Sequence, residues 1–373
     1  MQVVVEVRVT AGTPFDKKKL LLERLKSFMQ DKTVLLEHDY SAWMEDQELR
    51  VGLEQVYVGS DEKLSARFVN LGEVEELHYH CYQLYDECEQ SELYTRYTLP
   101  NARLESLWSG LLYDGGENAE LLALVNRMRL FSQSNLDTSL IAFNRLLLLT
   151  GPPGTGKTTL CKALSHELSI RDHRPSVLLC IHAHNLFSRW FSESGKLIDA
   201  LFEEIMESAQ GGHFVYVLVD EVESLTLARR AALQGNEPSD ALRAVNALLT
   251  CLDRLQEVSN VLLLATSNLP EVLDDAFLDR VDVRLEIKNP SKKVRYTILQ
   301  RAINELLRVG LVKGRTLPDY ESIDLYGDEV AGILRALVER TSDLSGRSLK
   351  KAVLKAYSTD QSELIEKLKH LLD

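Results

Sequence analysis

Residues 151–159 read Gly151-Pro152-Pro153-Gly154-Thr155-Gly156-Lys157-Thr158-Thr159, between an apolar stretch, Leu146–Leu149, and a segment with helical periodicity, Thr158–Leu168. The spacing Gly-x-x-x-x-Gly-Lys-Thr between a strand and a helix is the pattern of a phosphate-binding loop. Its glycines let successive backbone N–H groups converge on phosphate oxygens, and the following helix directs the positive end of its dipole at the same anion. These nine residues therefore predict a nucleotide site. We expect Lys157 to reach the β- and γ-phosphates and the Thr158 hydroxyl to ligate Mg²⁺.

Polar residues end two further apolar stretches. Asp220 and Glu221 follow Phe214–Val219, and Asn268 follows Val261–Ala265. In a buried parallel sheet, ligands bind at the carboxyl ends of the strands. We expect Asp220 to organise Mg²⁺ through water, Glu221 to polarise the water that attacks the γ-phosphate, and Asn268 to hold that water.

The order of apolar and helical segments predicts an α/β fold with three regions. Continuous apolar stretches separated by helices are typical of a parallel sheet that is covered on both faces. Residues 98–290 have this alternation, residues 1–97 suggest a small α+β domain, and residues 291–373 a helical domain. The strands expected in the large region are Arg145–Thr150, Val177–His182, Phe214–Val219 and Val261–Ala265, and its helices after the loop are Lys196–Ser208, Ser239–Leu255 and Glu271–Arg280. Strands are also expected at Val3–Val9 and Leu49–Val58.

Composition excludes several functional classes. The 373 residues carry a formal net charge of −13, which argues against a broad nucleic-acid or anionic-membrane surface. No apolar stretch approaches the ~18 residues of a membrane span. The segment His78-Tyr79-His80-Cys81 has no second ligand cluster nearby, so an ordinary alternating strand is favoured over a metal site.

The motifs together, from about residue 99 to 358, resemble an AAA+ ATPase. The resemblance implies ATP and Mg²⁺ as cofactors and a ring, usually a homo-hexamer, with ATP between subunits. It also implies that Arg280, in Leu-Asp-Arg-Val-Asp, is the arginine finger that reaches a neighbour's γ-phosphate, and that Arg347, in Ser-Gly-Arg-Ser, is the second sensor on the lid. Many relatives have a second arginine three residues before the first, where this chain has Phe277. The second role then falls to Arg284, to another residue or to none. A surface ion pair of Arg280 with Asp279 or Asp282 is the alternative.

Three stretches make the chain similar to the pachytene checkpoint ATPase family, which remodels HORMA-domain proteins in meiosis and the spindle checkpoint. They are Leu107–Asp114, the extended loop Gly151–Ala163, and His184–Gly195. The resemblance implies that Leu107–Asp114 contacts adenine, that residues 1–97 recognise the client with a HORMA-type adaptor, and that the protein acts in the nucleus and cytoplasm, with chromosomes and kinetochores as further sites.

The adjacent aromatics Trp190 and Phe191 stand in a Ser- and Gly-flanked segment. An exposed aromatic pair usually grips a partner, and by resemblance this pair lines the ring pore and pulls a client segment through it. A packed loop anchor and base stacking on single-stranded nucleic acid are the alternatives. For the whole protein, the alternatives to a HORMA remodeller are a clamp-loader or helicase-type motor and a nucleotide-dependent scaffold.

Overall fold

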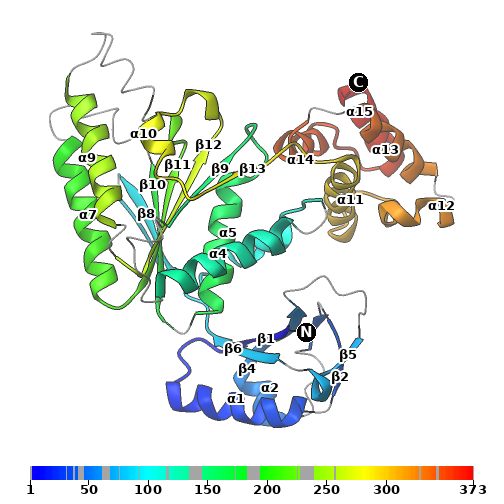
Figure 1. Cartoon of the computed structure of the whole chain (residues 1–373). Helices are drawn as coiled ribbons and strands as arrows, with labels where there is room; N and C mark the ends of the chain where they lie inside the picture. The colour runs from blue at the N-terminus through cyan, green and yellow to red at the C-terminus, as the bar shows by residue number, and fades with distance from the viewer. Residues whose placement is uncertain are drawn as a thin grey trace.

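The structure is a computed structural model, which describes residues 2–30, 32–36, 38–40, 46–60, 68–74, 76–91, 93–114, 117–133, 145–172, 174–182, 194–224, 226, 239–255, 258–326, 329–341 and 344–372. Figure 1 shows three parts: an α/β core, a small domain at the N-terminus and a helical lid at the C-terminus. This is the predicted fold class. Among the described helices, none combines the length and apolarity needed to cross a bilayer.

A seven-stranded sheet forms the centre of the core. Its order is β13 (Val283–Glu286), β9 (Leu146–Thr150), β12 (Val261–Ser267), β11 (Phe214–Asp220), β10 (Ser176–His182), β8 (Tyr94–Leu99) and β7 (Cys88–Gln90). The first five strands pair in parallel, whereas β8 is antiparallel to both β10 and β7. The carboxyl ends of β9, β12 and β11 therefore lie side by side at one edge of the sheet.

Helices cover both faces of this sheet (Figure 1). Helices α7 (Ser194–Gln210) and α9 (Ser239–Leu255) pack on one face, and α4 (Glu117–Gln133) and α5 (Lys157–Ile170) on the other. The run of leucines in β9 alternates between the two sides, because Leu146 and Leu148 join one apolar cluster and Leu147 and Leu149 the other. An apolar residue at every position is what a strand buried on both faces requires.

The sheet assigns β7 and β8 to the core rather than to the first domain. β7 lies before the expected boundary at residue 97 and β8 crosses it, yet β8 pairs with β10 over six residues, Tyr94–Leu99. Backbone hydrogen bonds decided the assignment, and these are made with a strand about 80 positions later in the chain.

The first domain is a four-stranded sheet of order β3 (His38–Asp39), β4 (Leu53–Ser60), β1 (Gln2–Val9) and β6 (Glu76–Tyr82). Helix α1 (Phe15–Met29) packs on it, and β2 (Thr33–Leu35) pairs with β5 (Phe68–Asn70). The strand expected from Leu49 was wrong at its start, because α2 (Gln47–Gly52) precedes β4. The Asp46 carboxylate caps this helix by accepting the N–H groups of Glu48 and Leu49.

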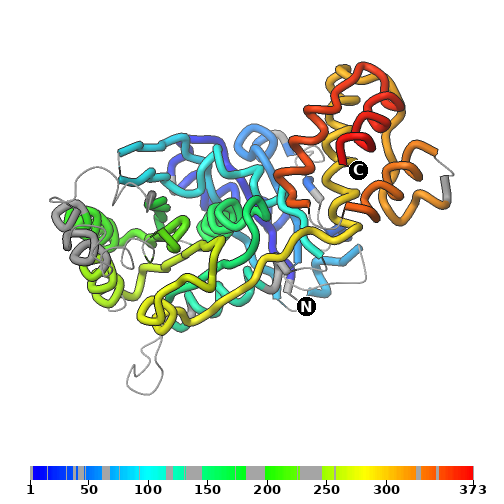
Figure 2. The backbone as a smooth tube through the Cα atoms, turned by 90° about the horizontal axis from the view of Figure 1, so that it is seen from above, coloured from blue at the N-terminus to red at the C-terminus, as the bar shows by residue number. Residues whose placement is uncertain are grey.

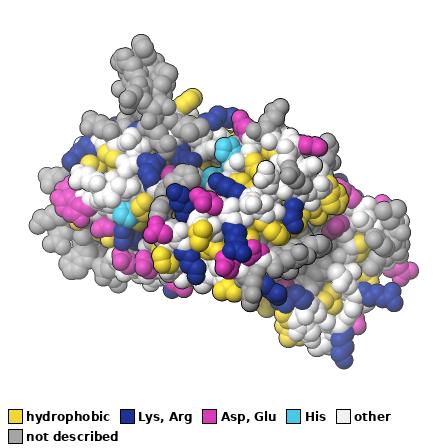
Figure 3. Space-filling model, turned by 90° about the horizontal axis from the view of Figure 1, so that it is seen from below, with side chains coloured by type: hydrophobic (Ala, Val, Ile, Leu, Met, Phe, Trp, Pro, Cys, Tyr) yellow, Lys and Arg dark blue, Asp and Glu magenta, His cyan; other side chains and the backbone are white. Residues whose placement is uncertain are grey.

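Ion pairs join the first domain to the core. Arg8 pairs with Glu105 on α3 (Glu105–Gly110), and Glu6 pairs with Arg171 at the end of α5, at 3.3 Å. On the face seen in Figure 3, basic, acidic and hydrophobic side chains are interspersed.

The lid consists of α11 (Lys292–Arg308), α12 (Ile323–Tyr326), α13 (Glu329–Arg340), α14 (Gly346–Lys355) and α15 (Gln361–Leu372) around its own apolar cluster. It stands beside the core in Figure 2. The expected helix Glu271–Arg280 is instead two short pieces, η3 (Pro270–Val272) and α10 (Asp275–Leu278). Leu273 between them is extended, and the Asp274 carboxylate starts α10 by accepting the N–H of Ala276.

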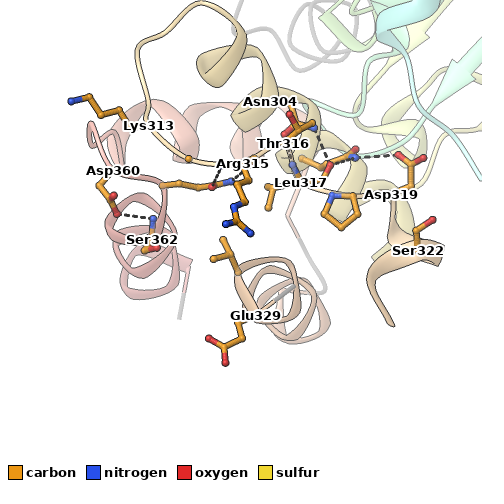
Figure 4. A pocket seen from close by; sticks show the side chains of 15 residues that line it. Asn304, Lys313, Arg315, Thr316, Leu317, Asp319, Ser322, Glu329, Asp360 and Ser362 are labelled. Atoms are coloured by element: carbon orange, nitrogen blue, oxygen red, sulfur yellow. Dashed lines mark hydrogen bonds between the residues drawn. The ribbon is translucent and has the colours of Figure 1, made fainter. Parts of the chain in front are cut away.

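The connector between α11 and α12 lines a polar cavity of about 980 Å³ in the lid (Figure 4). Asn304 donates to the carbonyl oxygen of Leu317 at 3.1 Å, and Gln300 to that of Leu317 at 3.1 Å and to the Asp319 carboxylate. None of the described residues that line it belongs to the predicted nucleotide site.

Candidate nucleotide site

The phosphate loop joins β9 to α5, as predicted, and its backbone requires glycine. Gly151 has φ of 138° and Gly154 φ of 81°, in the region that L side chains rarely adopt. A Cβ on Gly151 would stand 2.1 Å from the carbonyl oxygen of Ile287, which follows β13. Gly156, also left-handed, precedes the first residue of α5. The N-terminus of α5 is therefore directed at the loop, where an anion gains from its dipole.

Lys157 lies inside this loop and is 5% exposed. Its Nζ donates to the carbonyl oxygens of Gly151 at 2.7 Å and Pro152 at 2.8 Å. Burial lowers the pKa of Lys157, while the carboxylates of Glu223, Asp220 and Glu221 oppose that shift, in this order of strength. The lysine is thus a cation held in the loop and surrounded by acids.

Thr158 and Asp220, the two predicted metal ligands, are in direct contact. The Thr158 hydroxyl donates to Asp220 Oδ1 at 2.7 Å, and the Thr266 hydroxyl donates to the same oxygen. A hydroxyl and a carboxylate oxygen are the hard ligands that Mg²⁺ prefers, and phosphate oxygens and water complete such sites. The residues present therefore fit Mg²⁺ bound together with a nucleotide.

Glu221 is exposed at the turn after β11, with φ of 57°. A left-handed glutamate is strained and persists only where its surroundings hold it. Its backbone N–H donates to the Thr266 hydroxyl at 3.1 Å, and the N–H of Val222 donates to the Thr266 carbonyl at 3.0 Å. Thr266 on β12 thereby holds the turn that presents Glu221.

Asn268, just after β12, is half-buried, and its backbone N–H donates to Glu223 Oε1 at 3.0 Å. The sequence predictions did not include Thr266 or Glu223. A third carboxylate in Asp-Glu-Val-Glu was a signal for Glu223, whereas nothing in the sequence marked a threonine two residues before Asn268.

The lid brings Arg347 to the phosphate loop. The backbone N–H of Arg347, at the start of α14, donates to the Gly154 carbonyl at 3.3 Å. Between loop and lid lies a cavity of about 870 Å³. Its lining includes Gly154, Thr155, Gly156, Thr159 and Arg347, together with Leu107, Leu111, Tyr113 and Asp114 of the segment predicted to meet adenine.

Arg280 does not join these residues within one chain. Its guanidinium makes a two-pronged ion pair with Asp253 on α9, with Nε to Oδ1 at 2.6 Å and Nη2 to Oδ2 at 2.8 Å. The alternative to the finger role was an ion pair with Asp279 or Asp282, whereas the carboxylate that the guanidinium grips here is that of Asp253. Asp282 accepts the backbone N–H of Leu146 at 2.9 Å. Phe277 is buried in the apolar cluster between the sheet and helices α7 and α9, and Arg284 is exposed on β13.

Trp190 and Phe191, the predicted pore residues, lie outside the described residues. Arg229 and Arg230, the two basic residues of segment 228–239, where a nucleic-acid motor would need a more basic surface, also lie outside them.

Comparison with known proteins identifies the family. Residues 147–289 match the ATPase family associated with various cellular activities (AAA). The chain is 40% identical over 322 residues to a pachytene checkpoint protein 2 homolog of Arabidopsis thaliana, covering 77% of this chain and 69% of that protein. A structure of C. elegans PCH-2 superimposes with a TM-score of 0.80 and 31% identity, over 100% of this chain and 98% of that one. The chain in a structure of an E. coli MS115-1 HORMA:CdnC:Trip13 complex shares the fold, with a TM-score of 0.58 and 17% identity over 75% of this chain and 96% of that one.

The alignments span 61% to 69% of the lengths of the first curated relatives from plants and Caenorhabditis elegans. Sequence identity, the whole-chain superposition and the AAA match agree with one another. The chain belongs to the pachytene checkpoint protein 2 family of AAA ATPases.

Proposed function

We propose that this chain hydrolyses ATP between subunits of a homo-hexameric ring and uses the energy to convert HORMA-domain proteins from a closed to an open or unbound conformer. One observation supports the ATPase part: β9, β11 and β12 are neighbouring parallel strands, so that Lys157 of the loop after β9, Asp220 of β11 and Asn268 after β12 come from strand ends that lie side by side. The HORMA part is supported by the family and by the shared fold of the chain in the E. coli MS115-1 HORMA:CdnC:Trip13 complex.

Each residue of the site has a role in this reaction. The backbone N–H groups of the loop and the Lys157 ammonium hold the β- and γ-phosphates, and Thr158 and Asp220 would hold Mg²⁺. Bound Mg²⁺ would neutralise phosphate charge. Glu221 accepts a proton from a water whose oxygen bonds to the γ-phosphorus. The bond from that phosphorus to the β–γ bridging oxygen breaks, which leaves ADP and phosphate.

The ring explains the residues that lie apart. Arg280 stabilises the transferring phosphoryl group of a neighbouring subunit, after it leaves Asp253. Trp190 and Phe191 grip a client segment in the pore, and the first domain holds the client, with an adaptor. We propose that the protein works in the nucleus and cytoplasm.

The test is the steady-state ATPase rate of the full chain, alone, with a closed HORMA protein plus adaptor, and with single-stranded DNA. We expect the protein pair to stimulate hydrolysis, and Trp190→Ala to remove that stimulation while basal turnover and ATP binding remain. Stimulation by DNA alone would refute the HORMA assignment and favour a nucleic-acid motor. Stimulation that survives Trp190→Ala would make Trp190 a packing residue.

A further inference from the structure

The turn after β11 and the end of β12 are joined by hydrogen bonds that run in both directions. Thr266 accepts the N–H groups of Glu221 and Val222 through its hydroxyl and carbonyl oxygens, and Glu223 Oε1 accepts the N–H of Asn268. The first two bonds place Glu221, and the third places Asn268. Because all of them span the same two segments, they set the spacing between the residue expected to polarise the water and the residue expected to hold it.

Glu223 stands out among these groups because of the cost of its burial. It is 7% exposed, and its Oε2 is buried with no hydrogen-bond partner among the described residues. A buried polar atom without a partner costs about 1–3 kcal/mol, and more when it is charged. A neutral glutamine or an apolar residue would serve stability better. Groups that lower stability and persist are concentrated at functional sites.

The charge of Glu223 also interacts electrostatically with Lys157 in the phosphate loop. Of the three carboxylates that oppose the lowering of the Lys157 pKa, it has the strongest effect, ahead of Asp220 and Glu221. The Glu223 carboxylate therefore lies within electrostatic reach of Lys157. Because a negative charge does not attract phosphate, its removal does not by itself weaken nucleotide binding.

We propose that Glu223 is a positioning residue for ATP hydrolysis that acts through Asn268. Its Oε1 fixes the backbone N–H of Asn268, and this aims the Asn268 amide at the water that Glu221 deprotonates. The inference rests on the ATP hydrolysis proposed above. Glu223 itself touches neither water nor phosphate in this role, so its loss is expected to slow turnover without weakening nucleotide binding.

Two substitutions at Glu223 distinguish the effect of losing its hydrogen bond to Asn268 from the effect of a destabilised fold. Glu223→Leu removes the acceptor and also the unpartnered oxygen. We expect kcat to fall about 10- to 100-fold, as for other positioning contacts, with the KM for ATP within about twofold. The melting temperature should change little, because the substitution removes the unpartnered oxygen while the Asn268 N–H loses its acceptor. Glu223→Gln keeps an oxygen that can accept the Asn268 N–H, so most of kcat should return. Glu207→Leu, at an exposed carboxylate on α7, is the matched control.

A double-mutant cycle tests the route through Asn268. If Glu223 acts through Asn268, Glu223→Leu should cost nothing further in an Asn268→Ala background. Additive losses would overturn this route. A kcat loss in Glu223→Leu that comes with a lower melting temperature and weaker nucleotide binding would mean a structural role. Wild-type kcat in both variants, or a Gln variant as slow as Leu, would also refute the proposal. A wild-type protein without ATPase activity would instead refute the proposed function.

Discussion

The backbone N–H of Arg347, on lid helix α14, donates a hydrogen bond to the carbonyl oxygen of Gly154 in the phosphate loop at 3.3 Å. A Cβ on Gly154 would lie 2.7 Å from the Ser345 hydroxyl and 3.1 Å from the Cβ of Arg347. At Gly154, therefore, lid and loop meet in close contact, with no space for a side chain at this point beside the cavity. Any rotation of the lid must change this contact, so the position of the lid and the geometry of the phosphate loop are coupled.

Lys157→Ala is expected to abolish nucleotide binding, because the phosphates lose the buried cation of the loop. Charge-assisted hydrogen bonds to phosphate are strong, so we expect affinity to fall at least about 100-fold by isothermal titration calorimetry. Lys292→Ala, at an exposed lysine on the lid, is the control. Normal affinity in Lys157→Ala would contradict the assignment of the loop.

Glu221→Gln is expected to bind ATP normally and to hydrolyse it slowly. Glutamine can orient a water but cannot accept its proton, and general-base catalysis contributes about 10²–10⁴-fold. Binding by calorimetry and single-turnover hydrolysis separate the two effects. If turnover matched wild type, another residue would have to be the catalytic carboxylate.

Thr266→Val tests the support of the catalytic turn. Valine keeps the shape of the 1% exposed side chain but removes the hydroxyl that serves both Asp220 and the Glu221 N–H. We expect a loss of about 1–3 kcal/mol in the free energy of unfolding, by urea titration, from the unpartnered groups. The loss in kcat should exceed that of Thr250→Val, an exposed control on α9. Equal kcat values for Thr266→Val and Thr250→Val would show that the left-handed conformation of Glu221 does not depend on the Thr266 hydroxyl.

Arg280→Ala is expected to lower the ATPase rate and to be rescued in mixed rings. Glu221→Gln subunits supply the arginine but not the base, so mixing the two inactive variants should restore activity at some interfaces. Asp253, the present partner of Arg280, competes for the guanidinium, and Asp253→Asn should raise the basal rate. A mixture with no more activity than its components would place Arg280 in its own subunit's site or in the fold.

Gly151→Ala tests the backbone of the phosphate loop. With φ of 138° and the Ile287 carbonyl oxygen 2.1 Å from the new Cβ, alanine should lower the free energy of unfolding by about 2 kcal/mol or more. Gly332→Ala is the matched control, because nothing stands within 4 Å in helix α13 and alanine should stabilise it by about 0.5–1 kcal/mol. Thermal melts of both variants give the comparison. Equal melting temperatures would contradict the strain argued for Gly151.

Local patterns in the chain predicted the loop between β9 and α5, the strand ends at Asp220 and Asn268, and the layers of the core. The loop Gly151–Thr158 is recognisable from the sequence, because phosphate binding requires this glycine spacing and a lysine in any fold. The runs before Asp220 and Asn268 are apolar at every position, as a strand covered on both faces demands. Helix α9 begins and ends at the predicted residues. These features depend on residues that are neighbours in the sequence, so the amino-acid sequence is enough to predict them.

Tertiary structure alone decided which distant groups meet. The pairing of β8 with β10, the contact of Arg347 with Gly154, and the ion pair of Arg280 with Asp253 each join segments that no local pattern connects. The same holds for Thr266 and Glu223, ordinary residues in the sequence that hold the catalytic turn in the fold. Hydrogen bonds and ion pairs between distant segments depend on how whole elements are arranged, whereas hydrophobic periodicity and glycine spacing depend on the conformation of a single element.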